Sequence, residues 1–79
     1  MRIVSQDKDL SFEFENTPIW TQYKAIYAMI GNNDKLIGMY DSEKEAENVF
    51  EDIHKAYGKI YTNIEYLKDM TYYMLKTVL

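Results

Sequence analysis

The residues that could do chemistry in this chain of 79 residues are few, and His54 is its only histidine. A transition-metal site usually draws on a second histidine or a cysteine, and the chain has neither. A histidine in the last turns of a predicted helix is ordinarily solvated and favours the negative end of the helix dipole. We therefore interpret His54 as a structural residue rather than as a general base or a metal ligand.

Carboxylates spaced one helical turn apart form the second candidate site. They are Glu43, Glu47 and Glu51, with Asp52 beside the last of them. Hard cations need several oxygens that converge from a loop, and the face of one straight helix does not converge. We interpret these four residues as a solvated face, with partner binding as the functional alternative.

The sequence lacks the residues that other common catalytic or binding motifs require. The segment Asn32-Asn33-Asp34 is too short for a calcium loop, which has about twelve residues. The serines have no glycine-framed elbow and no histidine positioned to activate them, and no glycine loop could hold a phosphate. We predict that the chain is not an enzyme and has no cofactor.

Aromatic residues are the surplus of this sequence, with eight tyrosines and one tryptophan. Tyrosine offers a rigid contact area with a polar tip, which is typical of protein interfaces. Core packing would account for most of these side chains, but a domain this small is expected to leave some of them exposed. The candidate contact residues are Trp20, Tyr66, Tyr72 and Tyr73.

Length and composition indicate one globular domain over residues 1–79, because 47% of the residues are hydrophobic and only one is proline. The formal net charge of −4 and a pI near 4.8 argue against direct nucleic-acid binding, which needs clustered Lys and Arg. No apolar run is long enough for a signal peptide or a membrane span. We expect a cytoplasmic protein that does not bind membranes.

The elements that must position these residues begin with strands. Residues 1–4 and the alternating residues 10–15 predict two strands, and residues 35–40 predict another after a tight turn at residues 31–34. Gly38 lacks a side chain, so another element is expected to approach closely there. Residues 17–31 fit two descriptions equally: one helix capped by Thr17, or two strands joined at Lys24-Ala25.

The second half of the chain predicts helices. Ser42 and Glu45 form a capping box, apolar residues recur at helical spacing, and Gly58 supplies a stop, so a helix is predicted over residues 42–57. A second helix is predicted over about residues 63–78, with Asn63 as its cap.

The predicted fold is α+β, with a small antiparallel sheet of three to four strands from residues 1–41 packed by helix 42–57. The C-terminal helix crosses the same sheet or pairs with a second copy, and we expect a homodimer. The predicted core consists of Phe12, Phe14, Ile26, Ala28, Ile37, Met39, Val49, Phe50, Ile53 and Tyr57.

The order and spacing of several short motifs resemble those of small uncharacterised proteins encoded by phages and prophages of low-GC Gram-positive bacteria. The matching segments are MRIVSQD at residues 1–7, LSF at 10–12, FE at 14–15, IYA at 26–28, IGMY at 37–40 and SEKEA at 42–46. Lys8 and Glu13 stand where the family usually has glycine and proline, and the tail from Lys59 lacks the short extended ending associated with it.

The resemblance implies a meander of strands followed by a helix, which favours two strands over residues 18–30. It implies no activity and offers no catalytic residue. Three functions remain open: a phage-type protein that binds another protein without catalysis, an acidic mimic of nucleic acid that occupies a basic groove through Glu43, Glu47, Glu51 and Asp52, and a small-ligand or metal binder around His54.

Overall fold

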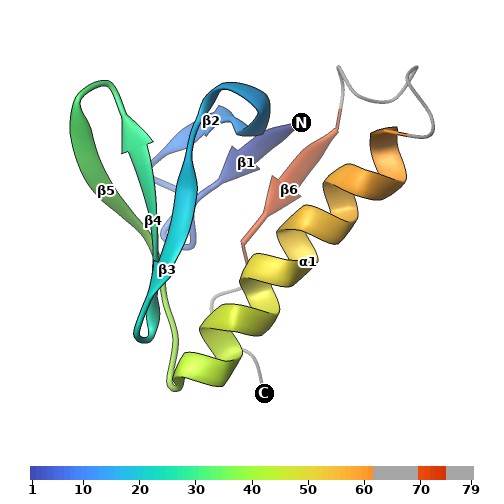
Figure 1. Cartoon of the computed structure of the whole chain (residues 1–79). Coiled ribbons are helices and arrows are strands. Elements are labelled where there is room, and N and C mark those ends of the chain that lie inside the picture. The colour runs from blue at the N-terminus through green and yellow to red at the C-terminus, as the bar shows by residue number, and fades with distance from the viewer. Residues whose placement is uncertain (62–69, 75–79) are drawn as a thin grey trace.

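The computed structural model describes residues 1–61 and 70–74, which form six strands, one 3-10 turn and one helix (Figure 1). The elements run in this order: β1 (Arg2–Val4), β2 (Ser11–Glu13), the 3-10 turn η1 (Phe14–Asn16), β3 (Ile19–Gln22), β4 (Ala25–Ile30), β5 (Asn33–Met39), α1 (Glu43–Tyr61) and β6 (Thr71–Tyr73). The predicted α+β class is confirmed.

The strands form two sheets rather than the single predicted one. We call the sheet with order β2-β1-β6 the terminal sheet and the sheet with order β3-β4-β5 the central sheet. In the central sheet both pairs are antiparallel, whereas in the terminal sheet β1 pairs parallel to β6. The prediction of one antiparallel sheet from residues 1–41 was wrong because the terminal sheet takes its third strand from residues 71–73.

The predicted C-terminal helix is also wrong where the structure describes it. Thr71 pairs with Arg2 and Tyr72 with Ile3, so residues 71–73 are a strand. A β-branched residue followed by two tyrosines suits a strand, and tertiary pairing with β1 overrides the helical spacing of the tail. The tail thus contains a short extended element, contrary to our expectation. The rest of the predicted helix, with Tyr66, lies outside the described residues.

Residues 19–30 form two strands, and the alternative of a single helix was wrong. The turn between β3 and β4 consists of Tyr23 and Lys24, because Gln22 pairs with Ala25. Tyr23 has a positive φ of 55°, and the tight two-residue connection demands such a backbone angle. The predicted turn after residue 30 is confirmed at Gly31, which has a φ of 65°, and Asn32, whereas Asn33 and Asp34 belong to β5.

Helix α1 starts as predicted. The Ser42 hydroxyl accepts a hydrogen bond from the Glu45 backbone N–H at 3.1 Å, and the Glu45 carboxylate accepts one from the Asp41 N–H at 3.3 Å. The helix does not stop at Gly58 but continues to Tyr61. Glycine permits a helix end without imposing one, since it costs only about 1 kcal/mol inside a helix, and no proline follows.

Both sheets and α1 contribute side chains to one core. Of the predicted core residues, Phe12, Ile26, Ala28, Ile37, Val49 and Ile53 are buried, and Phe14, Phe50 and Tyr57 pack against them while half-buried. Met39 is the exception, with 51% of its surface exposed.

A β-bulge explains why the prediction for Met39 was wrong. Tyr27 pairs with Leu36, whereas Ile26 pairs with Gly38, so Ile37 has no partner on β4. The extra residue shifts the in–out alternation of β5 by one position, and Met39 therefore leaves the core. The close approach predicted at Gly38 is confirmed, because a Cβ there would lie 2.7 Å from the Cε atom of Met74.

Candidate functional site

The outer face of the central sheet is the candidate site. Residues that pair directly across antiparallel strands share one face, and Trp20 pairs with Tyr27, which pairs with Leu36. The next cross-strand row joins Gln22, Ala25 and Met39. These side chains, with Met29 at the far end of β4, form what we call the outer face.

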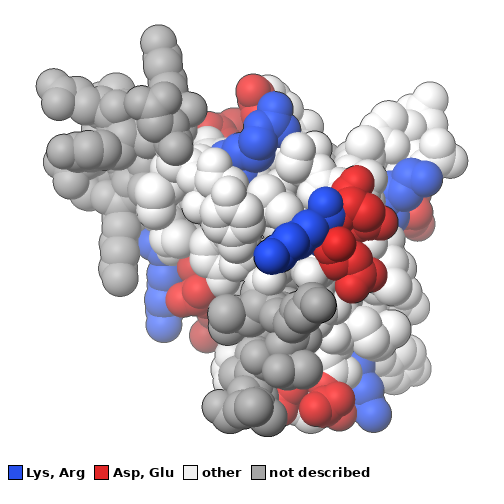
Figure 2. Space-filling model, turned by 180° about the vertical axis from the view of Figure 1, so that it is seen from behind, with Lys and Arg blue, Asp and Glu red and all other residues white. Residues whose placement is uncertain are grey.

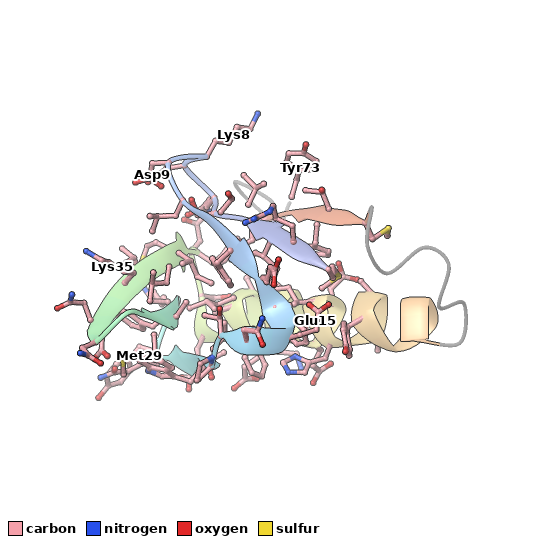
Figure 3. All side chains as sticks on the ribbon, turned by 90° about the horizontal axis from the view of Figure 1, so that it is seen from above. Lys8, Asp9, Glu15, Met29, Lys35 and Tyr73 are labelled. Atoms are coloured by element: carbon pink, nitrogen blue, oxygen red, sulfur yellow. The ribbon has the colours of Figure 1, made fainter. Side chains whose placement is uncertain are left out.

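The opposite face of the same sheet lies in the core. Ile26 and Ala28 of β4 are fully buried, whereas Met29, Leu36 and Met39 are exposed by 37, 48 and 51% of their surface. No element within residues 1–61 and 70–74 covers the outer face, since α1 and the terminal sheet share the core with the inner one. Figure 3 shows Met29 projecting away from the body of the molecule. The central sheet is thus apolar on both sides.

Two aromatic rings lie at the middle of the outer face. The Trp20 and Tyr27 rings stack with their centroids 6.0 Å apart and an angle of 18° between their planes. Each ring is half-buried by its neighbours and so is held in place while it keeps surface exposed. Rigid, half-exposed aromatic side chains are typical of the residues that dominate binding energy in protein interfaces.

A hollow lies at the end of the outer face where β3 turns into β4. Its volume is about 430 Å³, and its lining is Gln22, Tyr23, Lys24, Ala25, Tyr27, Met39 and Glu43. Tyr23 is 76% exposed beside it, on a backbone angle that is uncommon for a bulky residue. The lining is mostly apolar and carries one charge of each sign, Lys24 and Glu43, which suits an apolar side chain better than a polyanion.

The acidic candidates lie together on α1, away from the hollow apart from Glu43. Glu43, Glu47, Glu51 and Asp52 are all exposed. Figure 2, seen from behind the view of Figure 1, shows acidic and basic side chains scattered with uncharged surface between them, and no basic patch among the described residues on that side. The four acidic side chains are thus exposed on one helix, and among the described residues only Asp52 forms a hydrogen bond with another candidate residue.

That contact links Asp52 to Tyr72. The Tyr72 hydroxyl donates a hydrogen bond to the Asp52 carboxylate at 2.5 Å and so ties β6 to α1. Burial, together with this bond and the negative charges of Asp52 and Tyr40, raises the pKa of Tyr72 above the ordinary tyrosine value. Burial likewise raises the pKa of Tyr40 to about 12. We therefore interpret Tyr72 as a residue that stabilises the fold, whereas Tyr73 points outward with 63% of its surface exposed.

His54 is exposed, and its contacts are with neighbouring residues of the fold. Its Nδ1 atom lies 2.9 Å from the Phe50 carbonyl oxygen one turn earlier, and its ring contacts the Phe14 and Phe50 rings at centroid distances of 5.3 and 4.5 Å. Within the described part of the chain, no three potential metal ligands come together.

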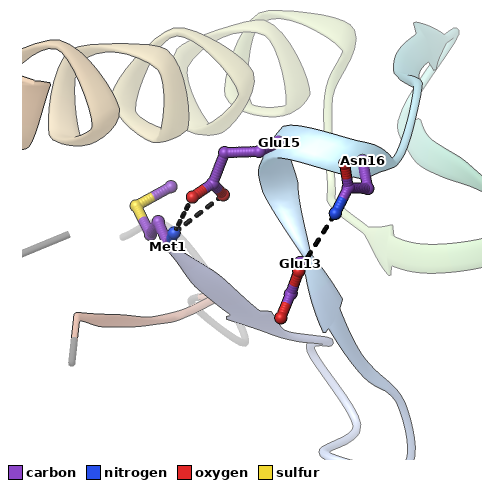
Figure 4. A network of polar contacts seen from close by, with 4 residues as sticks. All are labelled: Met1, Glu13, Glu15 and Asn16. Carbon is purple, nitrogen blue, oxygen red and sulfur yellow. Dashed lines mark hydrogen bonds and ion pairs between the residues drawn. The ribbon is translucent and has the colours of Figure 1, made fainter. Parts of the chain in front are cut away.

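An ion pair fixes the start of β1 against η1 (Figure 4). The buried Met1 ammonium contacts both carboxylate oxygens of Glu15, at 2.7 and 2.5 Å. Partial burial alone would raise the pKa of Glu15, but the hydrogen bond and the positive charge of this ammonium outweigh that effect and lower it. The pair is a structural feature of the terminal sheet.

Sequence reasoning found Trp20 but missed most of the site. Tyr27, Leu36 and Met39 were not candidates. Met39 was assigned to the core because the bulge cannot be recognised from the alternation pattern. A detectable signal was present in β4, where alternate residues on both faces are apolar. A strand with this pattern is either buried on both sides or binds a partner.

Within the described residues, no helix is long and apolar enough to cross a membrane. Comparison of the chain with family models, with curated proteins and with solved structures finds no match. The geometry and chemistry of the outer face therefore carry the functional argument.

Proposed function

We propose that this protein is a non-enzymatic binding module that contacts another protein through the outer face of its central sheet. The observation that carries the proposal is the row of Trp20, Tyr27 and Leu36, continued by Met39, on a sheet side that no described element covers. Aromatic residues and methionine are enriched in interfaces relative to the rest of protein surfaces.

The arrangement of polarity supports this proposal. The apolar row lies at the middle, while Asp34, Lys24 and Glu43 lie toward its two ends. Interfaces commonly have such an apolar centre with a polar rim, where the rim excludes water and sets orientation. The hollow beside Tyr23 would accept an anchoring side chain of the partner.

The test compares two double variants that change the charge equally. Leu36→Lys with Met39→Lys places two positive charges on the outer face, and Glu47→Gln with Glu51→Gln removes two negative charges from α1. Each variant and the wild type are used as immobilised bait for proteins in a lysate of a low-GC Gram-positive bacterium, the host class that the sequence resemblance implies. We expect the wild type and the α1 variant to retain the same protein and the outer-face variant to lose it.

A protein retained by the outer-face variant but lost by the α1 variant would overturn the proposal. It would favour the acidic mimic of nucleic acid, whose support is that Glu43, Glu47, Glu51 and Asp52 are all exposed on one helix. Binding of that kind weakens steeply with added salt, because it depends on charge. A salt titration of the captured complex therefore separates the two functions.

Two expectations from the sequence stay predictions. The first is the phage or prophage origin, and the second is a homodimer. Sedimentation equilibrium of the wild type and the outer-face variant tests the homodimer, because a dimer formed through this face dissociates when Leu36 and Met39 become lysine.

A further inference from the structure

The free edge of the central sheet at β5 is a second surface that the fold leaves open. Among the residues that the structure describes, only β4 pairs with β5, and Figure 1 shows β5 on the side of the sheet away from α1. Seven residues from Asn33 to Met39 run along this edge. An unpaired edge offers backbone donors and acceptors in the register of a strand.

The turn geometry determines which groups face outward. Gly31 and Asn32 form a two-residue connection, so Ile30 and Asn33 are the closing pair that exchanges hydrogen bonds. Bonded and non-bonded pairs then alternate, and Asp34 and Leu36, opposite Met29 and Tyr27, direct their N–H and C=O groups away from β4. Among residues 1–61 and 70–74, no other segment forms a backbone hydrogen bond with them there.

Gln6 shows that this edge binds strand-like groups. The Gln6 backbone N–H donates to the Ile37 carbonyl at 2.8 Å. Its side-chain amide accepts from the Met39 N–H and donates to the Met39 carbonyl, both at 2.8 Å. One glutamine thus occupies the end of the edge as a peptide unit would, and the open part is limited to Asp34–Leu36.

We propose that an extended segment of a different protein pairs antiparallel with β5 at Asp34 and Leu36 and adds a fourth strand to the central sheet. This inference rests on the proposed function and specifies how the partner docks. Side chains of the added strand would alternate between the outer face, beside Leu36 and Tyr27, and the opposite side.

Charge argues against a second copy as the occupant. Pairing of β5 with itself about Lys35 places two lysines opposite each other, and a shift by one residue toward the turn places Asp34 opposite Asp34. A shift the other way, which would align Leu36 with Leu36, brings the new strand against Gln6. Like charges directly opposite across strands are destabilising.

The same charges define the partner segment. A residue opposite Leu36 adjoins the apolar row, a residue opposite Lys35 should be acidic, and a residue opposite Asp34 should be basic. Read from the N-terminus, the predicted signature in an antiparallel partner is apolar, acidic, basic.

The experiment uses a peptide of sequence Thr-Thr-Val-Glu-Arg-Thr-Thr, and a control peptide in which Glu and Arg are exchanged. Titration to millimolar concentration is followed by the amide signals of the isotope-labelled full chain. We expect the largest shifts at Asp34 and Leu36, and binding about tenfold weaker for the control peptide. Absence of shifts at these two amides would overturn the inference.

A proline substitution tests the backbone contact itself. Asp34→Pro removes an outward N–H while the hydrogen bonds between β4 and β5 stay intact, as proline is tolerated on edge strands at such positions. The matched control is Asp34→Ala, which also loses the charge. We expect the proline variant to bind the peptide about tenfold more weakly than the alanine variant, and equal binding would overturn the inference.

Hydrogen exchange of the wild type covers the case in which the proline variant does not fold. The amides of Asp34 and Leu36 should exchange rapidly in the free chain and become protected by the peptide, whereas the Lys35 amide is protected in both states. Rapid exchange of Asp34 and Leu36 in the presence of saturating peptide would overturn the inference.

The lysate experiment separates this inference from the proposed function. A captured protein lost by the Leu36→Lys and Met39→Lys variant but retained by Asp34→Pro supports the outer face and overturns edge pairing. A captured protein lost by both supports both. Retention by the outer-face variant overturns the proposed function, and the peptide titration then decides on the edge independently.

Discussion

The two sheets of this molecule differ in the residues that they expose on their outer faces. In the terminal sheet Ile3 and Phe12 face the core. On the outside, Arg2 lies opposite Glu13 and donates a hydrogen bond to the Ser11 hydroxyl at 3.4 Å, and Val4 lies opposite the exposed Tyr73. In the central sheet the inner residues are equally buried, but Trp20, Tyr27 and Leu36 occupy the outside.

The terminal sheet therefore serves as an internal reference. It shows that a three-stranded sheet in this fold can bury one face and carry charged residues, such as Arg2 and Glu13, on the other. The additional apolar face of the central sheet is not required by the fold. This difference between the sheets supports the proposed contact of the outer face with a partner.

The largest expected effect tests whether the two sheets share one core. Ile3→Ala in the terminal sheet removes a fully buried side chain and should lower the free energy of unfolding by about 2–5 kcal/mol, as should Ile26→Ala in the central sheet. Urea unfolding is followed by circular dichroism and by Trp20 fluorescence. If the midpoint of the Trp20 fluorescence transition is unchanged in Ile3→Ala, the two sheets unfold separately. If Ile3→Ala does not fold, Ile3→Val replaces it, with an expected loss of about 0.5–1.5 kcal/mol in the free energy of unfolding.

The next effect concerns the link between the sheets. Gln6→Ala leaves the Met39 N–H and C=O without their partner and should cost about 1–3 kcal/mol in urea unfolding. Gln6→Glu keeps an acceptor for the Met39 N–H but places a buried carboxylate oxygen against the Met39 carbonyl, so a loss at least as large is expected. An unchanged free energy in both variants would mean that Gln6 does not hold the edge of β5.

A smaller, pH-dependent effect is expected in the terminal sheet. The pKa of Glu15 is lowered in the folded state, so its ion pair with Met1 stabilises the fold above the ordinary carboxyl pKa of 4.5. This contribution is lost as the pH falls through the folded-state pKa. Because the carboxylate is 36% exposed, Glu15→Gln should cost at most about 1 kcal/mol at neutral pH.

Urea unfolding of Glu15→Gln and the wild type at pH 7 and in acid measures this difference. It should shrink in acid, and a difference that stays constant would contradict the assignment. The matched control is Glu13→Gln, whose carboxylate accepts a hydrogen bond from the Asn16 amide at 3.0 Å and does not contact Met1.

The smallest expected effect tests most directly whether the outer face of the central sheet contributes to stability. Leu36→Lys and Met39→Lys should each change the free energy of unfolding by no more than about 0.5 kcal/mol, because both side chains are exposed. Thermal unfolding at equal protein concentration measures it. A loss well above 1 kcal/mol would show that the outer face supports the fold itself.

Much of the architecture could be predicted from local patterns. The capping box at Ser42, the turn at Gly31 and the apolar spacing of Val49 and Ile53 are local signals, and each is confirmed. The division into two sheets was not predictable, because it depends on β6 pairing with β1 across nearly the whole sequence. Nothing local in residues 71–73 identifies that partner.

The candidate site was harder to predict than the fold. Trp20 was identified from its type, but Met39 was placed in the core because the bulge at Ile37 reverses the alternation of β5. Gln6 was not a candidate, and only the tertiary contact between the loop after β1 and β5 reveals its role. Strand register and long-range hydrogen bonds cannot be predicted from the spacing of residues in the sequence.

The parallel pairing of β1 with β6 has a consequence for the order of folding. The two hairpins of the central sheet need only residues 19–39, whereas the pairing of Arg2 with Thr71 closes a loop of nearly the entire polypeptide. Because distant contacts form more slowly than local ones, we expect the hairpins to assemble early during synthesis. β1 would then pair with β6 only after residues 71–73 have been synthesised.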